Sequence, residues 1–263
     1  MKLSISNIAW PADIDQQVYA LMKQYRYEGL EIAPTRIFPN EPYDDLRKAE
    51  EWSVNLFEEC GFLVSSLQSI WFGRQEKLFG TDEERSFLMN YTKKAVDFAQ
   101  IVKCHNLVFG CPRNRYCPEE DFWNIGVEFF RKIGNYAHAK GTVIGMEANP
   151  TIYNTNYINS TMSALRLIKE VNSPGFLLNL DMGTMIYNEE SINLLKGNTK
   201  LINHVHISEP GLKPILQREI YKELSEILMA EKYEGFVSIE MGKIEDVFII
   251  ESVMRYVKEV FGQ

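Results

Sequence analysis

The sequence predicts a single (β/α)8 barrel over residues 1–263, and three observations lead to this prediction. Short apolar runs rich in β-branched residues alternate eight times with longer segments of helical periodicity, as in a parallel sheet wrapped by amphipathic helices. The 263 residues lie close to the length of such a barrel, about 250 residues. No G-x-G-x-x-G turn follows the first strand, where an open dinucleotide-binding sheet would carry one.

The predicted strands are the eight apolar runs, and the segment after each of them is predicted to be a helix. The strands are residues 3–8, 29–32, 63–68, 106–109, 142–147, 176–181, 204–208 and 235–240. Thr81 stands three residues before Glu84, as in a capping box. Pro118 is followed by two acids, as in the first turn of a helix, and Gly61 precedes a strand, where a left-handed residue ends a helix.

The charge and hydropathy of the chain exclude several classes of protein. Lys and Arg total 28 against 36 Asp and Glu, and the net charge of −8 repels a phosphate backbone, so nucleic acid is not an expected partner. No segment has the roughly 18 uninterrupted apolar residues of a membrane span, and no signal peptide follows Met1, which predicts a cytoplasmic protein. Apolar and aromatic loop residues such as Ile152, Tyr153 and Tyr157 could cover the pocket or form the contact of a homo-oligomer.

Four consecutive predicted strands end on a carboxylate or an imidazole. These residues are Glu147, Asp181, His206 and Glu240, at separations of 34, 25 and 34 residues, each consistent with one βα unit. The carboxyl ends of the strands meet at one rim of a barrel, where active sites form. Each acid taken singly could instead cap the next helix or lie in a solvated loop.

Three carboxylates brought together at one rim favour a metal site. Burying them without a cation is costly, and one divalent ion removes that cost. Oxygen ligands with one imidazole favour Mn²⁺ or Mg²⁺, with Zn²⁺, Co²⁺ and Fe²⁺ also compatible. His204 shares the face of its strand with His206 and either hydrogen-bonds an acid behind the ligands or fills a core position.

At these strand ends the chain resembles the xylose isomerase-like TIM-barrel superfamily, in particular the sugar phosphate isomerases and epimerases typified by tagatose and allulose 3-epimerases. The resemblance rests on GLEI at 29–32, EANP at 147–150, Asp181, HVHISE at 204–209 and IE at 239–240. It implies that Glu147, Asp181, His206 and Glu240 bind the metal. It also implies that Glu147 and Glu240 act as acid and base through an enediolate of a small sugar or sugar derivative.

The sequence departs from these epimerases at two positions. Thr184 stands three residues after Asp181, where they commonly carry a histidine that touches the substrate. Leu212, with Lys213 next to it, stands six residues after His206, where they commonly carry an arginine. The resemblance therefore implies metal-assisted proton chemistry and leaves the sugar open.

Other residues are candidates for binding the substrate, each with a structural alternative. Trp10, Gln68 and Trp71 could stack on or contact a sugar, or simply pack in the core. Arg113 and Arg115 could clamp an acidic group or lie in solvent, while Asn149 and Glu209 are candidates to support the neighbouring ligands.

Three other functions remain as alternatives to the epimerase. One is a dehydratase of an inosose or related polyol on the same barrel, and another is an inactive barrel that binds a sugar without converting it. An endonuclease with a trinuclear zinc site would need more than the four histidines present.

Overall fold

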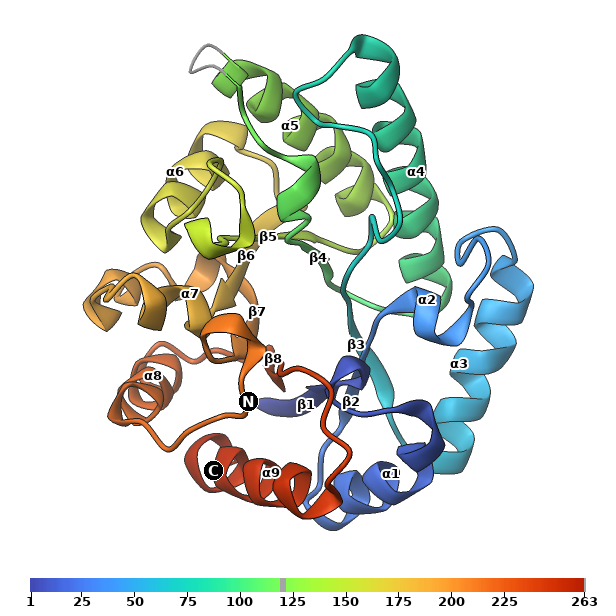
Figure 1. Cartoon of the computed structure of the whole chain (residues 1–263), viewed down its shortest axis with the longest axis vertical. Coiled ribbons are helices and arrows are strands. Elements are labelled where there is room, and N and C mark those ends of the chain that lie inside the picture. Colours follow the sequence, from blue (N-terminus) through green and yellow to red (C-terminus); the bar gives the residue numbers. More distant parts are fainter. Residues whose placement is uncertain (119–121, 263) are drawn as a thin grey trace.

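The computed structural model describes residues 1–118 and 122–262. Eight parallel strands form a closed barrel in chain order, and β8 pairs with β1 to close it (Figure 1). The strands are β1 (Lys2–Ser6), β2 (Gly29–Ile32), β3 (Leu63–Leu67), β4 (Leu107–Phe109), β5 (Ile144–Glu147), β6 (Phe176–Asp181), β7 (Ile202–Ile207) and β8 (Phe236–Ile239). The predicted (β/α)8 barrel is confirmed.

Helices surround the barrel on its outer side (Figure 1). They are α1 (Asp15–Gln24), α2 (Pro34–Ile37), α3 (Leu46–Cys60), α4 (Asp82–Ile101), α5 (Trp123–Ala139), α6 (Thr161–Val171), α7 (Met182–Tyr187), α8 (Glu219–Ala230) and α9 (Val247–Phe261). Among the described helices, none is both long enough and apolar enough to cross a membrane.

The predicted helix ends have mixed outcomes. Thr81 and Glu84 form the expected capping box at the start of α4. Gly61 ends α3 with a φ of 78°, in the left-handed region that a residue without Cβ adopts at little cost. The helix start predicted at Pro118 continues into residues 119 and 120, which lie outside the described residues, and α5 begins at Trp123.

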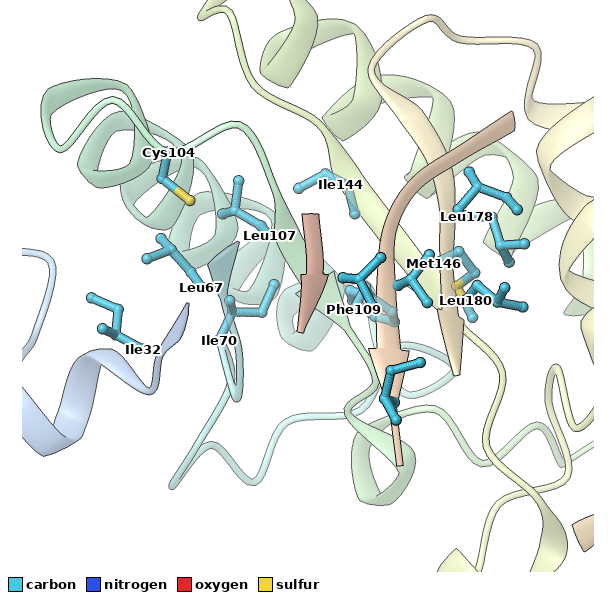
Figure 2. Close-up of a cluster of buried hydrophobic side chains, with 14 of the residues drawn as sticks. Ile32, Leu67, Ile70, Cys104, Leu107, Phe109, Ile144, Met146, Leu178 and Leu180 are labelled. Atoms are coloured by element: carbon cyan, nitrogen blue, oxygen red, sulfur yellow. The ribbon is translucent and has the colours of Figure 1, made fainter. Parts of the chain in front are cut away.

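The main hydrophobic layer lies between the strands and the helices. Alternate residues of each strand point outward, and Figure 2 shows Phe109, Met146 and Leu180 close to one another in this layer. Phe130 of α5 stacks on Phe176 of β6 with ring centroids 4.8 Å apart. Phe130 also lies edge-on to Phe109, so these contacts pack α5 against β4 and β6.

The inward-facing residues of the barrel are unusually polar. Asn106 donates to Ser66 at 2.9 Å and to Oδ1 of Asn179 at 3.2 Å. Asn179 in turn donates from Nδ2 to Oε1 of Glu147 at 3.0 Å. A chain of buried amides therefore leads from the barrel interior to Glu147 and satisfies groups that would otherwise be costly to bury.

Candidate active site

The predicted ligands meet at the carboxyl ends of the strands, around a cavity of about 200 Å³. Glu147, Asp181 and Glu240 line this metal cavity, and His206 is buried beneath them with no exposed surface. Glu240 lies one residue beyond β8, but its N–H still donates to the carbonyl of Ile207 on β7. A backbone hydrogen bond to β7 therefore positions Glu240 at the edge of the sheet.

The Nδ1 atom of His206 is the point on which two glutamates converge. It lies 2.9 Å from Oε1 of Glu147 and 3.2 Å from Oε2 of Glu240. Ligand atoms of these three residues all lie within 4.8 Å of one another, and the group could hold a metal ion. The glutamates come from β5 and from the end of β8, so they reach the imidazole from different parts of the rim.

Glu31 holds the far side of the same imidazole. Its Oε1 lies 2.9 Å from Nε2 of His206, and its Oε2 lies 3.2 Å from Nε2 of His204. His204 is thus a hydrogen-bond partner of an acid behind the ligands. With Nε2–H directed to a carboxylate, Nδ1 is left to face the cavity, an orientation typical of metal-bound histidine.

Asp181 differs from Glu240 because both oxygens of its carboxylate accept hydrogen bonds from several protein groups. Oδ1 accepts from the N–H of Gly183 at 3.0 Å and from the Ser208 hydroxyl. Oδ2 accepts from the N–H of Thr184 at 3.1 Å and from its hydroxyl at 2.7 Å. Asp181 therefore caps α7, as the sequence alternative allowed, while it also lines the metal cavity.

The ionisation of the site shows how costly these buried charges are. Burial raises the pKa of Asp181, the charge of Glu147 raises it further, and the Ser208 hydroxyl opposes the rise. Burial also raises the pKa of Glu240, against the opposing effect of His206. Burial alone would lower the pKa of His206, but Glu240 and Glu31 outweigh it and hold that pKa well above 6.5. A divalent cation fits this donor set because it would neutralise the excess negative charge.

Arg115 supports Glu147 from behind instead of lying in solvent. It is fully buried, its Nη1 donates to the carbonyl of Glu147 at 2.9 Å, and its Nη2 donates to Oδ1 of Asn149 at 2.8 Å. Asn149 then donates to Oε2 of Glu147 at 3.0 Å. Burial lowers the pKa of Arg115 to about 10, so the side chain remains charged at neutral pH.

The structure places the remaining substrate-binding candidates in different surroundings. Gln68 lines the metal cavity and donates to Ser6. Trp71 is buried against Phe109 with ring centroids 4.7 Å apart, and Trp10 is fully buried with its Nε1 donating to Asp15. The structure brings neither indole into the metal cavity.

Two charged candidates are exposed, and a third is paired. Arg113 and Lys213 are exposed and are not among the residues that line the metal cavity. Glu209 does line it, but its carboxylate is bound by Arg218 through contacts of 2.7 and 3.0 Å and by Tyr221 at 3.1 Å. The Glu209–Arg218 pair therefore fixes the loop after β7.

Sequence reasoning assigned no role to Glu31 in the site, and it gave Tyr153 only as a loop residue that covers the pocket or forms a dimer contact. Glu31 could have been found from its place between Leu30 and Ile32, because a lone acid in a buried strand must have a partner. Tyr153 lines the metal cavity and accepts a hydrogen bond from the N–H of Gly211, which leaves its own proton free to donate. Its place in the loop after β5 was the sequence signal, and the structure places it at the cavity.

The closed barrel, with acids and an imidazole at its rim that could hold a metal ion, defines the class of protein. Comparison with known proteins identifies the family. A family model described as xylose isomerase-like TIM barrel matches residues 19–259, so the chain belongs to that family. A comparison with curated proteins found no match.

Several solved structures share the fold at low sequence identity. A 3-keto-D-glucoside 4-epimerase from E. coli is 20% identical with a TM-score of 0.78, covering 98% of this chain and 99% of its own. A D-psicose 3-epimerase from Clostridium cellulolyticum H10, solved with D-tagatose, is 17% identical with a TM-score of 0.80, covering 99% of each chain. A probable 3-DHS dehydratase from Bacillus anthracis is 15% identical with a TM-score of 0.74, covering 98% of this chain and 99% of its own.

Proposed function

We propose that the protein is a metal-dependent isomerase or epimerase of a sugar or sugar derivative. The observation that carries the proposal is the convergence of Glu147 and Glu240 on Nδ1 of His206 at the edge of one cavity. The epimerases among the structural neighbours support it, since they share the fold over nearly the whole chain. Glu147, His206 and Glu240 would hold the ion, with Asp181 as the predicted fourth ligand.

The two glutamates would carry the protons. A bound divalent ion would polarise a substrate carbonyl and so acidify the adjacent C–H. One glutamate takes that proton as a base, the electron pair of the C–H bond moves into an enediolate, and the other glutamate returns a proton to carbon. Return to the opposite face of the same carbon gives an epimer, whereas return to the neighbouring carbon gives an isomer.

The supports of the two glutamates differ, which suits unequal roles. Glu147 is held by Asn149, Asn179 and His206. Among the described residues, His206 is the only hydrogen-bond or ion-pair partner of the Glu240 carboxylate. Because Glu240 has fewer bonds to break, we assign it the larger movement during proton transfer.

Solvent-deuterium exchange tests the proposal. Mn²⁺-loaded protein is incubated in D₂O with neutral and acidic ketoses, and deuterium at carbon is followed by NMR. Glu240→Gln and Glu147→Gln should each lower exchange by about 100-fold or more. Glu231→Gln, a surface cap that contacts Gly197 and Thr199, serves as the matched control. Unchanged exchange in Glu240→Gln would contradict the two-carboxylate scheme.

A dehydratase is the second candidate, favoured by the neighbour that is named as one. It would begin with the same proton removal and then expel hydroxide from the adjacent carbon. The mass of the product separates the two activities, because dehydration lowers it by one water. Binding of a sugar with neither exchange nor product would instead indicate the inactive sugar-binding barrel.

A further inference from the structure

A second and larger cavity adjoins the metal cavity on the same rim of the barrel. We call it the side cavity, and its volume is about 900 Å³. It is lined by residues that follow β1, β2, β3 and β8, and it shares Ile8 and Ser69 with the lining of the metal cavity. The two cavities therefore lie next to each other at these two residues.

The charges of the side cavity are mainly positive. Arg36, Arg74 and Lys243 line it, against Glu41 as the acid in the lining. Arg36 is neutralised by Asp15 at 2.6 Å. Among the described residues, neither the Arg74 guanidinium nor the Lys243 ammonium takes part in a hydrogen bond or an ion pair. Arg74 and Lys243 are thus two cations without an ion pair at a cavity whose lining holds one acid, Glu41, in a chain whose net charge is −8.

Arg74 is held in place although its guanidinium has no polar partner. Its N–H donates to the carbonyl of Trp71 at 3.0 Å, and its own carbonyl accepts from Asn114 at 3.0 Å. The guanidinium carbon lies 5.0 Å from the centre of the Tyr91 ring. Its Nε is buried with no hydrogen-bond partner among the described residues. Because the guanidinium at this cavity has no hydrogen bond or ion pair among the described residues, an acceptor supplied by a ligand would stabilise it.

The geometry points to an acidic substrate. We propose that the side cavity binds an anionic group, a carboxylate or a phosphate, attached to the sugar that lies in the metal cavity. Arg74 provides a planar fork of donors for the anion, and Lys243 adds a second charge at the solvent side. Phe72, whose side chain is 67% exposed, provides an apolar surface for the carbon chain between the two groups. This inference rests on the proposed function only in assuming that a sugar occupies the metal cavity.

Binding measurements on the Mn²⁺-loaded full chain test the proposal. The probes are D-fructose, D-fructose 6-phosphate and D-glucuronate. Titration calorimetry measures the affinity of the protein for each probe at low and at high salt. We expect at least one acidic probe to bind about 10-fold or more tightly than D-fructose, and high salt to reduce that preference. The stronger of the two acidic probes identifies phosphate or carboxylate as the preferred group.

Variants then assign the preference to Arg74. Arg74→Gln should lower the affinity for the preferred acidic probe by about 10-fold or more and leave the affinity for D-fructose unchanged. Lys243→Gln should lower the affinity for the acidic probe by a smaller factor. Arg113→Gln is the matched control, because Arg113 is exposed and lines neither cavity. Thermal melting confirms that each variant is folded.

The outcomes separate this inference from the proposed function. Equal binding of neutral and acidic probes, no binding by either acidic probe, or an unchanged preference in Arg74→Gln would overturn the inference. If the glutamate variants exchange deuterium as fast as the unmodified protein, while the preference for an acidic probe still depends on Arg74, only the enzyme proposal is overturned. Exchange on neutral sugars without any charge preference would leave the enzyme proposal standing and remove the side cavity as an anion site.

Discussion

The Oε1 atom of Glu31 lies 2.9 Å from Nε2 of His206, on the side of the imidazole opposite to Glu147 and Glu240. Burial alone would raise the pKa of Glu31, but the charges and hydrogen bonds of His206 and His204 outweigh it and hold that pKa below its usual range. Glu31 is therefore an anion under all ordinary conditions. It fixes the ring so that Nδ1 faces the metal cavity.

Replacing Glu31 tests this orienting role. Glu31→Gln keeps the shape of the side chain but removes the charge that directs Nε2–H of His206. We expect the affinity for Mn²⁺ to fall by about 10- to 100-fold, the usual effect of losing such a partner. Titration calorimetry with Mn²⁺ measures it, and Glu231→Gln, an exposed residue at the C-terminal end of α8, should leave the affinity unchanged. An unaltered affinity in Glu31→Gln would show that the ring is oriented without it.

The metal-free protein should lose stability as the pH rises. A group whose pKa is raised on folding adds stability below its unfolded pKa, and this is lost as the pH rises through the folded pKa. The pKa values of Asp181, Glu240 and His206 are all raised, so all three groups act in this direction. The loss of stability begins above about pH 4 for the two acids and above about pH 6.5 for His206. His204 acts in the opposite sense, because burial lowers its pKa.

Mn²⁺ should reverse this trend. The ion replaces the proton on Nδ1 of His206, so its binding releases protons and strengthens as the pH rises. We expect the Mn²⁺-induced rise in melting temperature to be larger at about pH 8 than at about pH 6. Melting curves of chelator-treated and Mn²⁺-loaded protein across this range measure both effects. A metal-induced shift independent of pH would argue against His206 as a ligand.

Much of the fold could be predicted from the sequence because the relevant signals are local. Apolar runs of strand length, the Thr81 capping box and the Gly61 helix end depend on neighbouring residues alone. The boundaries were less predictable: the strand predicted to begin at His204 begins at Ile202, because pairing with Leu178 of β6 extends it. Pairing between strands depends on the closed barrel, which no local pattern contains.

The site could be predicted only in part, for the same reason. Glu147 and Glu240 could be placed at one rim because parallel strands share a direction. Glu31 lies 173 residues from His204 in the chain, and their contact arises only when the barrel closes. Thr184 hydrogen-bonds the Asp181 carboxylate because α7 begins directly after β6 and Asp181 caps it. The expectation that site residues stand at the carboxyl ends of the strands does not predict where the next helix begins.

The stacked pair of Phe130 and Phe176 provides a stability prediction remote from the candidate metal site. Phe130 is fully buried and also lies edge-on to Phe109 with ring centroids 4.8 Å apart. Phe130→Ala should lower the free energy of unfolding by about 3–5 kcal/mol. Denaturant unfolding measures it, with Phe248→Ala, at an 80% exposed side chain, as a control expected to change by under about 0.5 kcal/mol. A small effect at Phe130 would mean that the layer repacks around the lost ring.

Arg115 is a positioning residue for Glu147, and its replacement should separate proton transfer from metal binding. Arg115→Lys keeps the charge but cannot donate at once to the Glu147 carbonyl and to Asn149, so Asn149 loses its anchor and Glu147 loses its alignment. We expect the free energy of unfolding to fall by about 1–3 kcal/mol, the cost of an unsatisfied buried group.

The exchange rate at saturating sugar should fall by about 10-fold or more in Arg115→Lys, because misplacing a proton-transfer group slows the step that it carries. The affinity for Mn²⁺ should change far less, because Arg115 contacts none of the metal-facing carboxylate oxygens directly. Arg113→Lys, two residues away on the surface, should alter none of the three quantities. If exchange and metal affinity fall together in Arg115→Lys, the arginine supports the whole site instead of aligning Glu147.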